Sequence, residues 1–291
     1  MTVAAESMTG TRRSRRRSGT MNPAGRLILY VILVLSAVLF AFPFYWTFVG
    51  SLMTPVEIYS SIPHLWPSHP DFGNYARVFQ LVPMARYFLN SIITSVATMV
   101  VATIVASMAG YCFAQLRFMG KAFWFVLTLA TLMVPYQARL IPLFVMFTQY
   151  GLYDTYLGII LPGLASALGV FMMTQFFKGI PSELREAALI DGAGEPGVFF
   201  RVYLPLARAG VSTLAVLMFV QAWEQLLWPL IIAPKPEMRT LQVGLAYLGQ
   251  SLPTLNYQMA AIVISVVPIL VAFFLAQRQF VEGIAAGAVK Q

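Results

Sequence analysis

One polar stretch between two long apolar runs decides the fold. It reads Ile180-Pro181-Ser182-Glu183-Leu184-Arg185-Glu186-Ala187-Ala188-Leu189-Ile190-Asp191-Gly192-Ala193-Gly194. Pro181 and Ser182 are typical of a helix start, Glu183 suits the positive N-terminal end of a helix, and Gly192 is a suitable stop. The stretch therefore predicts a helix of about ten residues that lies outside the membrane.

Two interpretations of this helix are open from its residues alone. The Ala187-Ala188 pair leaves one side nearly bare, which permits the close approach of another protein. Polar contacts around that side can be made by Glu183, Arg185, Glu186 and Asp191. The helix is then a knob that enters a groove in a partner, or it is an amphipathic connector that rests on the membrane surface.

The composition on both sides of this stretch excludes an ordinary soluble protein. Of the 291 residues, 59% are hydrophobic and only 10% are charged, whereas a soluble domain has about a quarter of its residues charged. Lipid offers no partner to backbone N–H and C=O groups, so each long apolar run must be helical. Six membrane spans are predicted: Leu27 to Val49, Phe88 to Ala114, Ala122 to Phe147, Tyr156 to Phe177, Gly210 to Ala233 and Met259 to Gln277.

Positive charge predicts the orientation of these spans. Six crossings place both termini on one side, and that side carries fourteen Lys and Arg residues against four on the other. Loops and tails rich in Lys and Arg stay on the cytoplasmic side of a membrane, so both termini are predicted to be cytoplasmic. Residues 1–25, with arginine at five positions, predict a disordered basic tail. The net charge of +8 is thus interpreted as orientation, with no nucleic acid as partner.

The predicted outer segments are residues 51–87 and 234–257. In the first, Phe72, Tyr75, Val78 and Phe79 recur at helical spacing, which predicts a short helix at the outer interface. The single cysteine and the two histidines of the chain do not form a metal-ligand set, so no metal site is predicted.

Further residues connect the chain to a known family. Glu186-Ala187-Ala188, then Gly192, then after nine residues Val202-Tyr203-Leu204-Pro205 resemble the EAA signature of permease subunits in binding-protein-dependent ABC importers. The one departure is Val202, where isoleucine is usual. Similarity to the carbohydrate-importer (MalG/UgpE-like) branch extends over about residues 26 to 290 and is supported by Ile141-Pro142-Leu143-Phe144, Gly151-Leu152, Thr155, Ile160-Leu161-Pro162, Trp223 and Trp228-Pro229-Leu230.

This resemblance implies an all-α membrane protein with the type I ABC importer permease fold, formed by residues 26–291. It implies a second permease subunit, two ATPase subunits and an external substrate-binding protein, in a bacterial or archaeal cytoplasmic membrane. Within an EAA loop at 180–205, residues 182–192 would be the cytoplasmic coupling helix. Coupling to the ATPase would involve Glu183, Leu184, Glu186, Ala187, Ala188, Asp191 and Gly192.

The sequence agrees with a subunit that relies on a partner to hydrolyse ATP. No G-x-x-x-x-G-K-[ST] stretch, the loop that holds ATP phosphates, occurs in the chain. The chain is therefore expected to be a transport subunit and not an enzyme, and to bind no cofactor itself. ATP and magnesium would be held by the partner ATPases.

Two ionisable side chains fall within the predicted spans, Arg139 in the third and Glu224 in the fifth. Residue counting places both in the outer half of the membrane. Gln221, Glu224 and Trp228 are predicted to share one helical face, with Gln225 beside it. Amides and a carboxylate can form hydrogen bonds with sugar hydroxyls, and an aromatic ring can stack on the apolar face of a sugar ring. Three roles are open: contact with cargo or a gate, an interhelix bond between the two charges, or snorkelling to the lipid interface.

The main hypothesis is ATP-driven import of a di- or oligosaccharide or a related polyol. Import of glycerol-3-phosphate or a glycerophosphodiester is the alternative, because an anionic cargo would give Arg139 a purpose. An ion-driven transporter would need several acids in the membrane and interrupted spans, and Glu224 alone fits that expectation. A membrane hydrolase would need a Ser-His-Asp set or a metal site, which the predicted spans lack.

Overall fold

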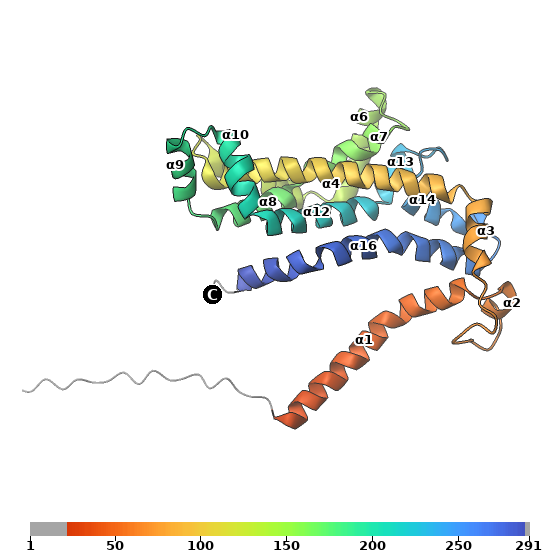
Figure 1. The fold of residues 1–291 in the computed structure, drawn as a ribbon. Helices are drawn as coiled ribbons and strands as arrows, with labels where there is room; N and C mark the ends of the chain where they lie inside the picture. Colours follow the sequence, from red (N-terminus) through yellow and green to blue (C-terminus); the bar gives the residue numbers. More distant parts are fainter. Residues whose placement is uncertain (1–21, 289–291) are drawn as a thin grey trace, which may run out of the picture. The chain divides into compact units, whose positions relative to one another are not determined.

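A computed structural model describes the backbone of residues 22–288 and the side chains of residues 22–274 and 277. Most of the predicted basic tail, residues 1–21, lies outside the described residues. Its last part differs from the prediction, because the first helix, α1 (Pro23–Ser51), already begins at Pro23. The described part of the chain is helical and contains no β-strand. It forms two compact units, with the boundary between Trp46 and Thr47 inside α1 (Figure 1).

Three helices of the described residues are each long and apolar enough to cross a membrane without a break. They correspond to the first, second and sixth predicted spans: α1, α4 (Met84–Gln115) and α16 (Leu255–Ala288). The remaining predicted spans are interrupted, and up to six spans result if each bent pair of helices is counted as one.

The third and fourth predicted spans are bent, which corrects the expectation of continuous helices. The third consists of α5 (Lys121–Ala130) and α6 (Tyr136–Gln149), whose arms meet at 99°. The bend falls where Val134 is extended before Pro135, because proline disfavours the helical conformation of the residue before it. The fourth consists of α7 (Tyr156–Ile160) and α8 (Ala167–Lys178), bent by 45°.

The fifth predicted span, Gly210 to Ala233, is also interrupted. It divides into α12 (Arg208–Trp223) and α13 (Leu227–Ile232). Pro229 has no N–H to donate to the carbonyl four residues earlier, at Gln225, so a helix cannot continue through this point without losing a hydrogen bond. Before α12 the chain turns by 84° from the segment Glu195–Leu206, which contains α10 (Glu195–Val198), a π-helical turn (Phe199–Tyr203) and α11 (Leu204–Leu206).

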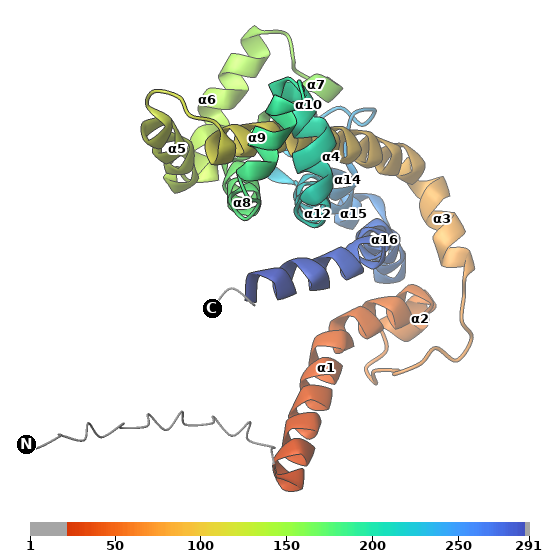
Figure 2. The same ribbon diagram turned by 60° about the vertical axis from the view of Figure 1, so that its left-hand side comes forward.

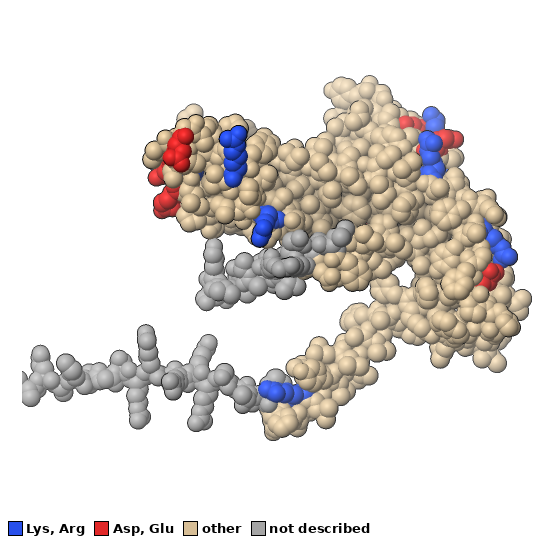
Figure 3. Space-filling model, in the orientation of Figure 1, with Lys and Arg blue, Asp and Glu red and all other residues tan. Residues whose placement is uncertain are grey.

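Within residues 47–288, α4 is the central helix. It packs against α8 and α12, and α12 packs in turn against α16, as Figures 1 and 2 show from two sides. One buried cluster joins α4, α8 and α12 near the polar loop, and a second joins α4, α12 and α16 at the other end. On the face in Figure 3, the charged side chains gather at the two ends of this bundle and leave an uncharged region between them, as a membrane-spanning bundle requires.

Residues 51–87, called the first outer segment after their predicted position, contain the predicted short helix. It is α3 (Gly73–Leu81), preceded by the single turn α2 (Pro55–Ile58). The buried Asn74 donates from Nδ2 to the carbonyl oxygens of Ser51 and Met53, at 2.9 and 3.0 Å. These bonds satisfy backbone carbonyls at the end of α1. The second outer segment contains α14 (Leu241–Ala246) and α15 (Leu248–Ser251), which were not predicted from the sequence.

Glu57 organises the loop around α2. Its carboxylate accepts from the backbone N–H groups of Thr54 at 3.0 Å and Ser68 at 2.9 Å, and the Thr54 hydroxyl accepts from the Glu57 N–H at 3.3 Å. These backbone hydrogen bonds, that of Thr54 first, lower the pKa of the Glu57 carboxyl from 4.5 to about 2. The ionised carboxylate therefore joins two parts of the loop that are eleven residues apart.

We expect the loop to lose this stabilisation only in strong acid. Because the folded-state pKa of Glu57 is depressed, its contribution is complete above pH 4.5 and is lost as the pH falls toward 2. The contribution can be measured at each pH as the protection of the Thr54 and Ser68 amides from hydrogen exchange. Glu57→Gln should reduce protection at all pH values above 4.5, whereas Glu237→Gln, in the other outer segment, should not. Equal protection in the wild type and Glu57→Gln would contradict this role.

Candidate coupling helix and transport cavity

The polar loop folds into α9 (Glu183–Ile190), with Ser182 and Asp191 as its flanking residues. Its end confirms the predicted glycine stop. Gly192 has φ +84°, its N–H donates to the Leu189 carbonyl at 3.1 Å, and the Ala193 N–H donates to the Ala188 carbonyl at 3.0 Å. These two bonds form a Schellman motif, which requires a residue in the left-handed conformation at Gly192.

Most of the predicted coupling residues are exposed on α9. Among the larger apolar side chains, Leu184 is 42% exposed and Ile190 is 85% exposed. Ala188 differs from the prediction, because it packs with Leu189 against the first buried cluster and so does not extend the bare side with Ala187. The exposed predicted residues are Glu183, Leu184, Glu186, Ala187, Asp191 and Gly192.

Ile190 is a candidate that was not predicted from the sequence. It lies four residues after Glu186 and so shares a face of α9 with it. With 85% of its surface exposed, this isoleucine offers apolar area that a protein partner can bury. The sequence pattern that could have identified Ile190 is an apolar residue one helical turn after Glu186.

Three side chains hold α9 to the rest of the bundle. Arg185 of α9 forms an ion pair with Glu195 at the start of α10, and the Tyr111 hydroxyl of α4 donates to the same carboxylate, to Oε2, at 2.8 Å. We call these three residues the clasp. None of them except Arg185 was noted in the sequence, because Tyr111 and Glu195 are 84 residues apart and no local pattern links them.

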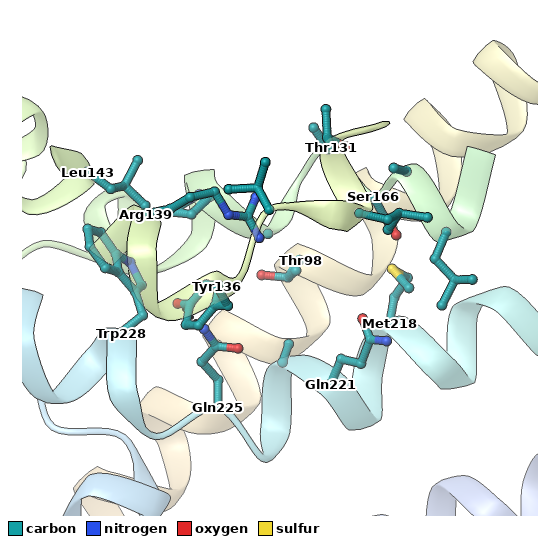
Figure 4. Close-up of a pocket in the computed structure, with 18 of the residues that line it drawn as sticks. Thr98, Thr131, Tyr136, Arg139, Leu143, Ser166, Met218, Gln221, Gln225 and Trp228 are labelled. Carbon is teal, nitrogen blue, oxygen red and sulfur yellow. Dashed lines mark hydrogen bonds between the residues drawn. The ribbon is translucent and has the colours of Figure 1, made fainter. Parts of the chain in front are cut away.

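A cavity of about 850 Å³ lies between α4, α6, α8 and α12 (Figure 4). Its size falls in the range of small-molecule sites, about 300 to 1,000 Å³. Among the described residues that line it, Arg139 has the only charged side chain. The other polar side chains of the lining include Thr94, Thr98, Tyr136, Ser166, Gln221 and Gln225.

Arg139 and Tyr136 share one face of α6. The guanidinium carbon of Arg139 lies 5.6 Å from the centroid of the Tyr136 ring, and the side chain extends into the cavity toward Thr98 (Figure 4). Gln225 Nε2 donates to the Tyr136 hydroxyl at 2.6 Å. Tyr136 is thus the half-buried aromatic side chain of this site, and it was not predicted from the sequence although it lies three residues before Arg139.

The suggested bond between Arg139 and Glu224 is not among the ion pairs of the described residues, which join Arg77 to Asp71, Arg185 to Glu195 and Lys235 to Asp154. Glu224 lines a smaller hollow that adjoins the cavity, since Tyr136 and Gln221 line both. The residue count that placed both charges in the outer half assumed continuous helices. The 99° bend before α6 invalidates that count for Arg139.

The predicted shared face of Gln221, Glu224 and Trp228 is wrong for Trp228, whereas Gln221 and Glu224 line one hollow together. The helix ends at Trp223, so Glu224 follows it as the capping residue and Trp228 belongs to the next helix. Trp228 is 1% exposed, donates from its indole N–H to the Gly158 carbonyl at 2.8 Å, and meets Phe147 edge-on at 5.3 Å. It is a packed part of the cavity wall and has no open ring face for a sugar.

An exposed helix that ends on a glycine stop and, further along the bundle, a cavity between α4, α6, α8 and α12 both fit the expected family. Comparison with known proteins decides the assignment. Residues 102–285 match the family described as "Binding-protein-dependent transport system inner membrane component". The chain belongs to this family. It is therefore an inner membrane permease subunit of an ABC importer, and members of this family are transport subunits and not enzymes themselves.

Two relatives cover nearly all of the permease. The sn-glycerol-3-phosphate transport system permease protein UgpE of Brucella abortus (strain 2308) is 36% identical over 275 residues, which cover 90% of this chain and 96% of that protein. The lactose transport system permease protein LacG of Rhizobium radiobacter is 34% identical over 265 residues, which cover 91% and 96%. The predicted resemblance to the carbohydrate branch is confirmed.

A solved structure shows the same fold. It is a crystal structure of a bacterial ABC transporter involved in the import of the acidic polysaccharide alginate, and one of its chains matches with a TM-score of 0.77 at 24% sequence identity. The match covers 89% of the permease and 98% of that chain. Interrupted spans, which were expected from the sequence only for an ion-driven transporter, thus occur in an ABC permease.

Proposed function

We propose that this permease forms half of the transport pathway for a sugar or a related polyol. The observation that carries the proposal is the identity of 34 to 36% to sugar and glycerol-3-phosphate permeases over about nine tenths of the chain. The cavity supports it, because hydroxyl and amide groups such as those of Thr98, Ser166 and Gln221 can exchange hydrogen bonds with sugar hydroxyls while the Tyr136 ring meets an apolar sugar face.

The partners follow from the same proposal. The permease pairs with a second permease subunit, docks two ATPase subunits that hold ATP and magnesium, and receives cargo from an external substrate-binding protein. If each bent pair is one span, the permease has six spans and both termini lie on the same side as α9. The excess of Lys and Arg on that side supports a cytoplasmic location. The exposed apolar region between the charged ends (Figure 3) supports contact with lipid.

In this mechanism α9 is the coupling helix. Leu184 and Ile190 provide apolar contacts for the ATPase, and Glu186 provides a polar contact beside them. ATP binding draws the ATPases together and moves α9, and the bundle changes from an inward-open to an outward-open cavity. A preference for one state arises only if the ATPase binds the two states with different affinities.

The test is uptake by the purified complex in lipid vesicles. The binding protein encoded beside this gene is first screened by thermal shift against disaccharides, polyols and glycerophosphodiesters, because a bound cargo stabilises it. Uptake of the identified cargo should require ATP inside the vesicles and the binding protein outside. Uptake that is driven by a proton or sodium gradient without ATP would contradict the proposal.

A second candidate cargo is an anionic one, such as glycerol-3-phosphate or a glycerophosphodiester. The specific observation is that Arg139 has the only charged side chain among the described residues around the cavity. A guanidinium binds phosphate or carboxylate through two parallel hydrogen bonds. An anionic cargo would therefore be held at Arg139, while a neutral sugar would use the hydroxyl and amide groups of the same cavity.

Arg139→Gln distinguishes these two cargo classes. For an anionic cargo, the loss of a hydrogen bond to a charged group should weaken apparent affinity by about ten- to a hundredfold. For a neutral sugar, the change should be smaller than about threefold, because a glutamine still offers hydrogen bonds. The measurement is a concentration series of uptake in vesicles. Gln221→Ala, on the facing wall, should affect both classes and serves as the control.

A further inference from the structure

The clasp concentrates three polar groups at the inner end of α4. The Tyr111 hydroxyl donates to Glu195 Oε2 at 2.8 Å, and Arg185 Nε donates to the same oxygen at 3.2 Å. A second guanidinium nitrogen of Arg185 contacts Oε1. Tyr111 is 4% exposed, so it is largely shielded from water, and this carboxylate accepts the hydrogen bond of its hydroxyl.

The ring of Tyr111 is fixed by other aromatic rings from two parts of the chain. Its centroid lies 6.0 Å from that of Phe177 in α8, and 5.4 and 5.1 Å from those of Phe199 and Tyr203 in the π-helical turn. The Tyr203 hydroxyl donates to the Pro181 carbonyl, just before α9, at 3.2 Å. The ring therefore cannot move independently of the segments that flank α9.

The backbone between α9 and Glu195 contains two glycines, Gly192 and Gly194. Glycine adopts many conformations and gives a segment little stiffness of its own. The ion pair between Arg185 and Glu195 spans this segment and joins both of its ends to Tyr111. The clasp, together with the packing of Ala188 and Leu189 against the first buried cluster, therefore holds α9 to α4, and the glycine-containing backbone adds little.

From Tyr111, α4 continues without interruption to the cavity. Thr98 and Thr94 line the cavity and lie thirteen and seventeen residues before Tyr111 in the same helix, which corresponds to about 20 and 26 Å along the axis. Of the other helices that wall the cavity, α6 follows a bend of 99°, whereas α8 and α12 are each unbroken along their own length, as α4 is. A continuous helix transmits a displacement along its length better than a bent one.

We propose that Tyr111, Arg185 and Glu195 are positioning residues that transmit the movement of α9 through α4 to the transport cavity. The inference rests on the proposed coupling role of α9. In the intact clasp, displacement of α9 moves Arg185, the paired Glu195 and the Tyr111 hydroxyl together, so α4 shifts and changes the wall that Thr94 and Thr98 form. Without the Tyr111 hydroxyl, α9 moves and the ATPase turns over while the cavity wall lags.

Tyr111→Phe tests this inference because it keeps the ring and removes only the hydroxyl. We expect cargo imported per ATP hydrolysed to fall by about tenfold, the effect of losing one hydrogen bond to a charged group on an equilibrium, while ATP hydrolysis itself persists. The assay uses the complete complex with its binding protein in vesicles. Glu195→Gln should lower the same ratio, and the double variant should be little worse than either single one.

Tyr156→Phe is the matched control. Its hydroxyl also donates to a side chain of α4, to Asn90 Oδ1 at 2.7 Å, but at the outer half of that helix and away from the clasp. It should lower the melting temperature of the complex as Tyr111→Phe does, and leave import per ATP unchanged. If Tyr111→Phe yields no complex, Arg185→Lys, which loses the paired contact but keeps the charge, replaces it.

Several outcomes would overturn the inference. An unchanged import-to-ATP ratio in Tyr111→Phe and Glu195→Gln would show that the clasp does not transmit movement. An equal fall in Tyr156→Phe would show a general effect of destabilising α4. Gly192→Val separates this inference from the proposed function. If it lowers import and stimulated ATP hydrolysis while Tyr111→Phe leaves import per ATP unchanged, only the clasp fails. If neither variant has an effect, the coupling role of α9 fails as well.

Discussion

Gly192→Val should abolish most import by the permease while the protein still reaches the membrane. Gly192 has φ +84°, a conformation that strains a β-branched residue by about 1 to 3 kcal/mol. The strain is relieved by opening the Schellman motif, which changes the direction in which α9 leaves the bundle. Import and binding-protein-stimulated ATP hydrolysis should both fall, and Gly192→Asn should retain more of each, since asparagine tolerates this conformation.

Gly151→Val is the matched control for this effect. Gly151 has φ +70°, and a side chain at either glycine would enter open space, because no heavy atom of the described chain lies within 4 Å of the point where its Cβ would be. Both substitutions therefore introduce strain without a clash, but Gly151 lies between α6 and α7, away from α9. Loss of stimulated ATP hydrolysis should be confined to Gly192→Val. An equal loss in both variants would contradict a specific role for the end of α9.

Trp228→Ala should destabilise the permease strongly and leave its cargo dependence unchanged. Trp228 is 1% exposed, and its indole donates to the Gly158 carbonyl. Truncation of a fully buried tryptophan costs about 3 to 5 kcal/mol, and here it also leaves a carbonyl of α7 without its partner. The melting temperature of the purified complex should fall, and the cargo concentration that gives half-maximal uptake should not change.

Gln221→Ala should give the opposite result. Gln221 is exposed on the cavity wall, so its loss should change half-maximal uptake and leave the melting temperature unchanged. If Trp228→Ala instead weakens cargo binding without lowering stability, the ring contacts cargo. The packed-wall role derived from its burial would then be wrong.

The elements that the sequence predicted well depend on local rules. The spans at α1, α4 and α16 follow from the length of an apolar run, and the end of α9 follows from glycine at position 192. The bends were missed because an apolar run looks the same whether it forms one helix or two. Pro135 and Pro229 were visible in the sequence. Pro135 immediately precedes α6, and Pro229 lies in the first turn of α13, the helix that follows the other break.

The site was predicted only in part for the same reason. Glu224 and Trp228 were placed together by helical periodicity, which fails across a break in the helix. Tyr136 and Ile190 had local signals that were available but not used. Contacts such as that of Tyr111 with Glu195 join residues 84 positions apart and need the tertiary structure, since no spacing rule relates them.

The most direct measurement for the central claim is site-specific photo-crosslinking from α9. A photoreactive amino acid replaces Ile190, which is 85% exposed, in the complete complex in vesicles. The coupling role predicts adducts with the ATPase subunit whose yield changes when ATP is added. The same probe at Tyr150, which is 75% exposed after the end of α6, should give none. Adducts of position 190 with lipid alone, or ATPase adducts from position 150 only, would contradict the account.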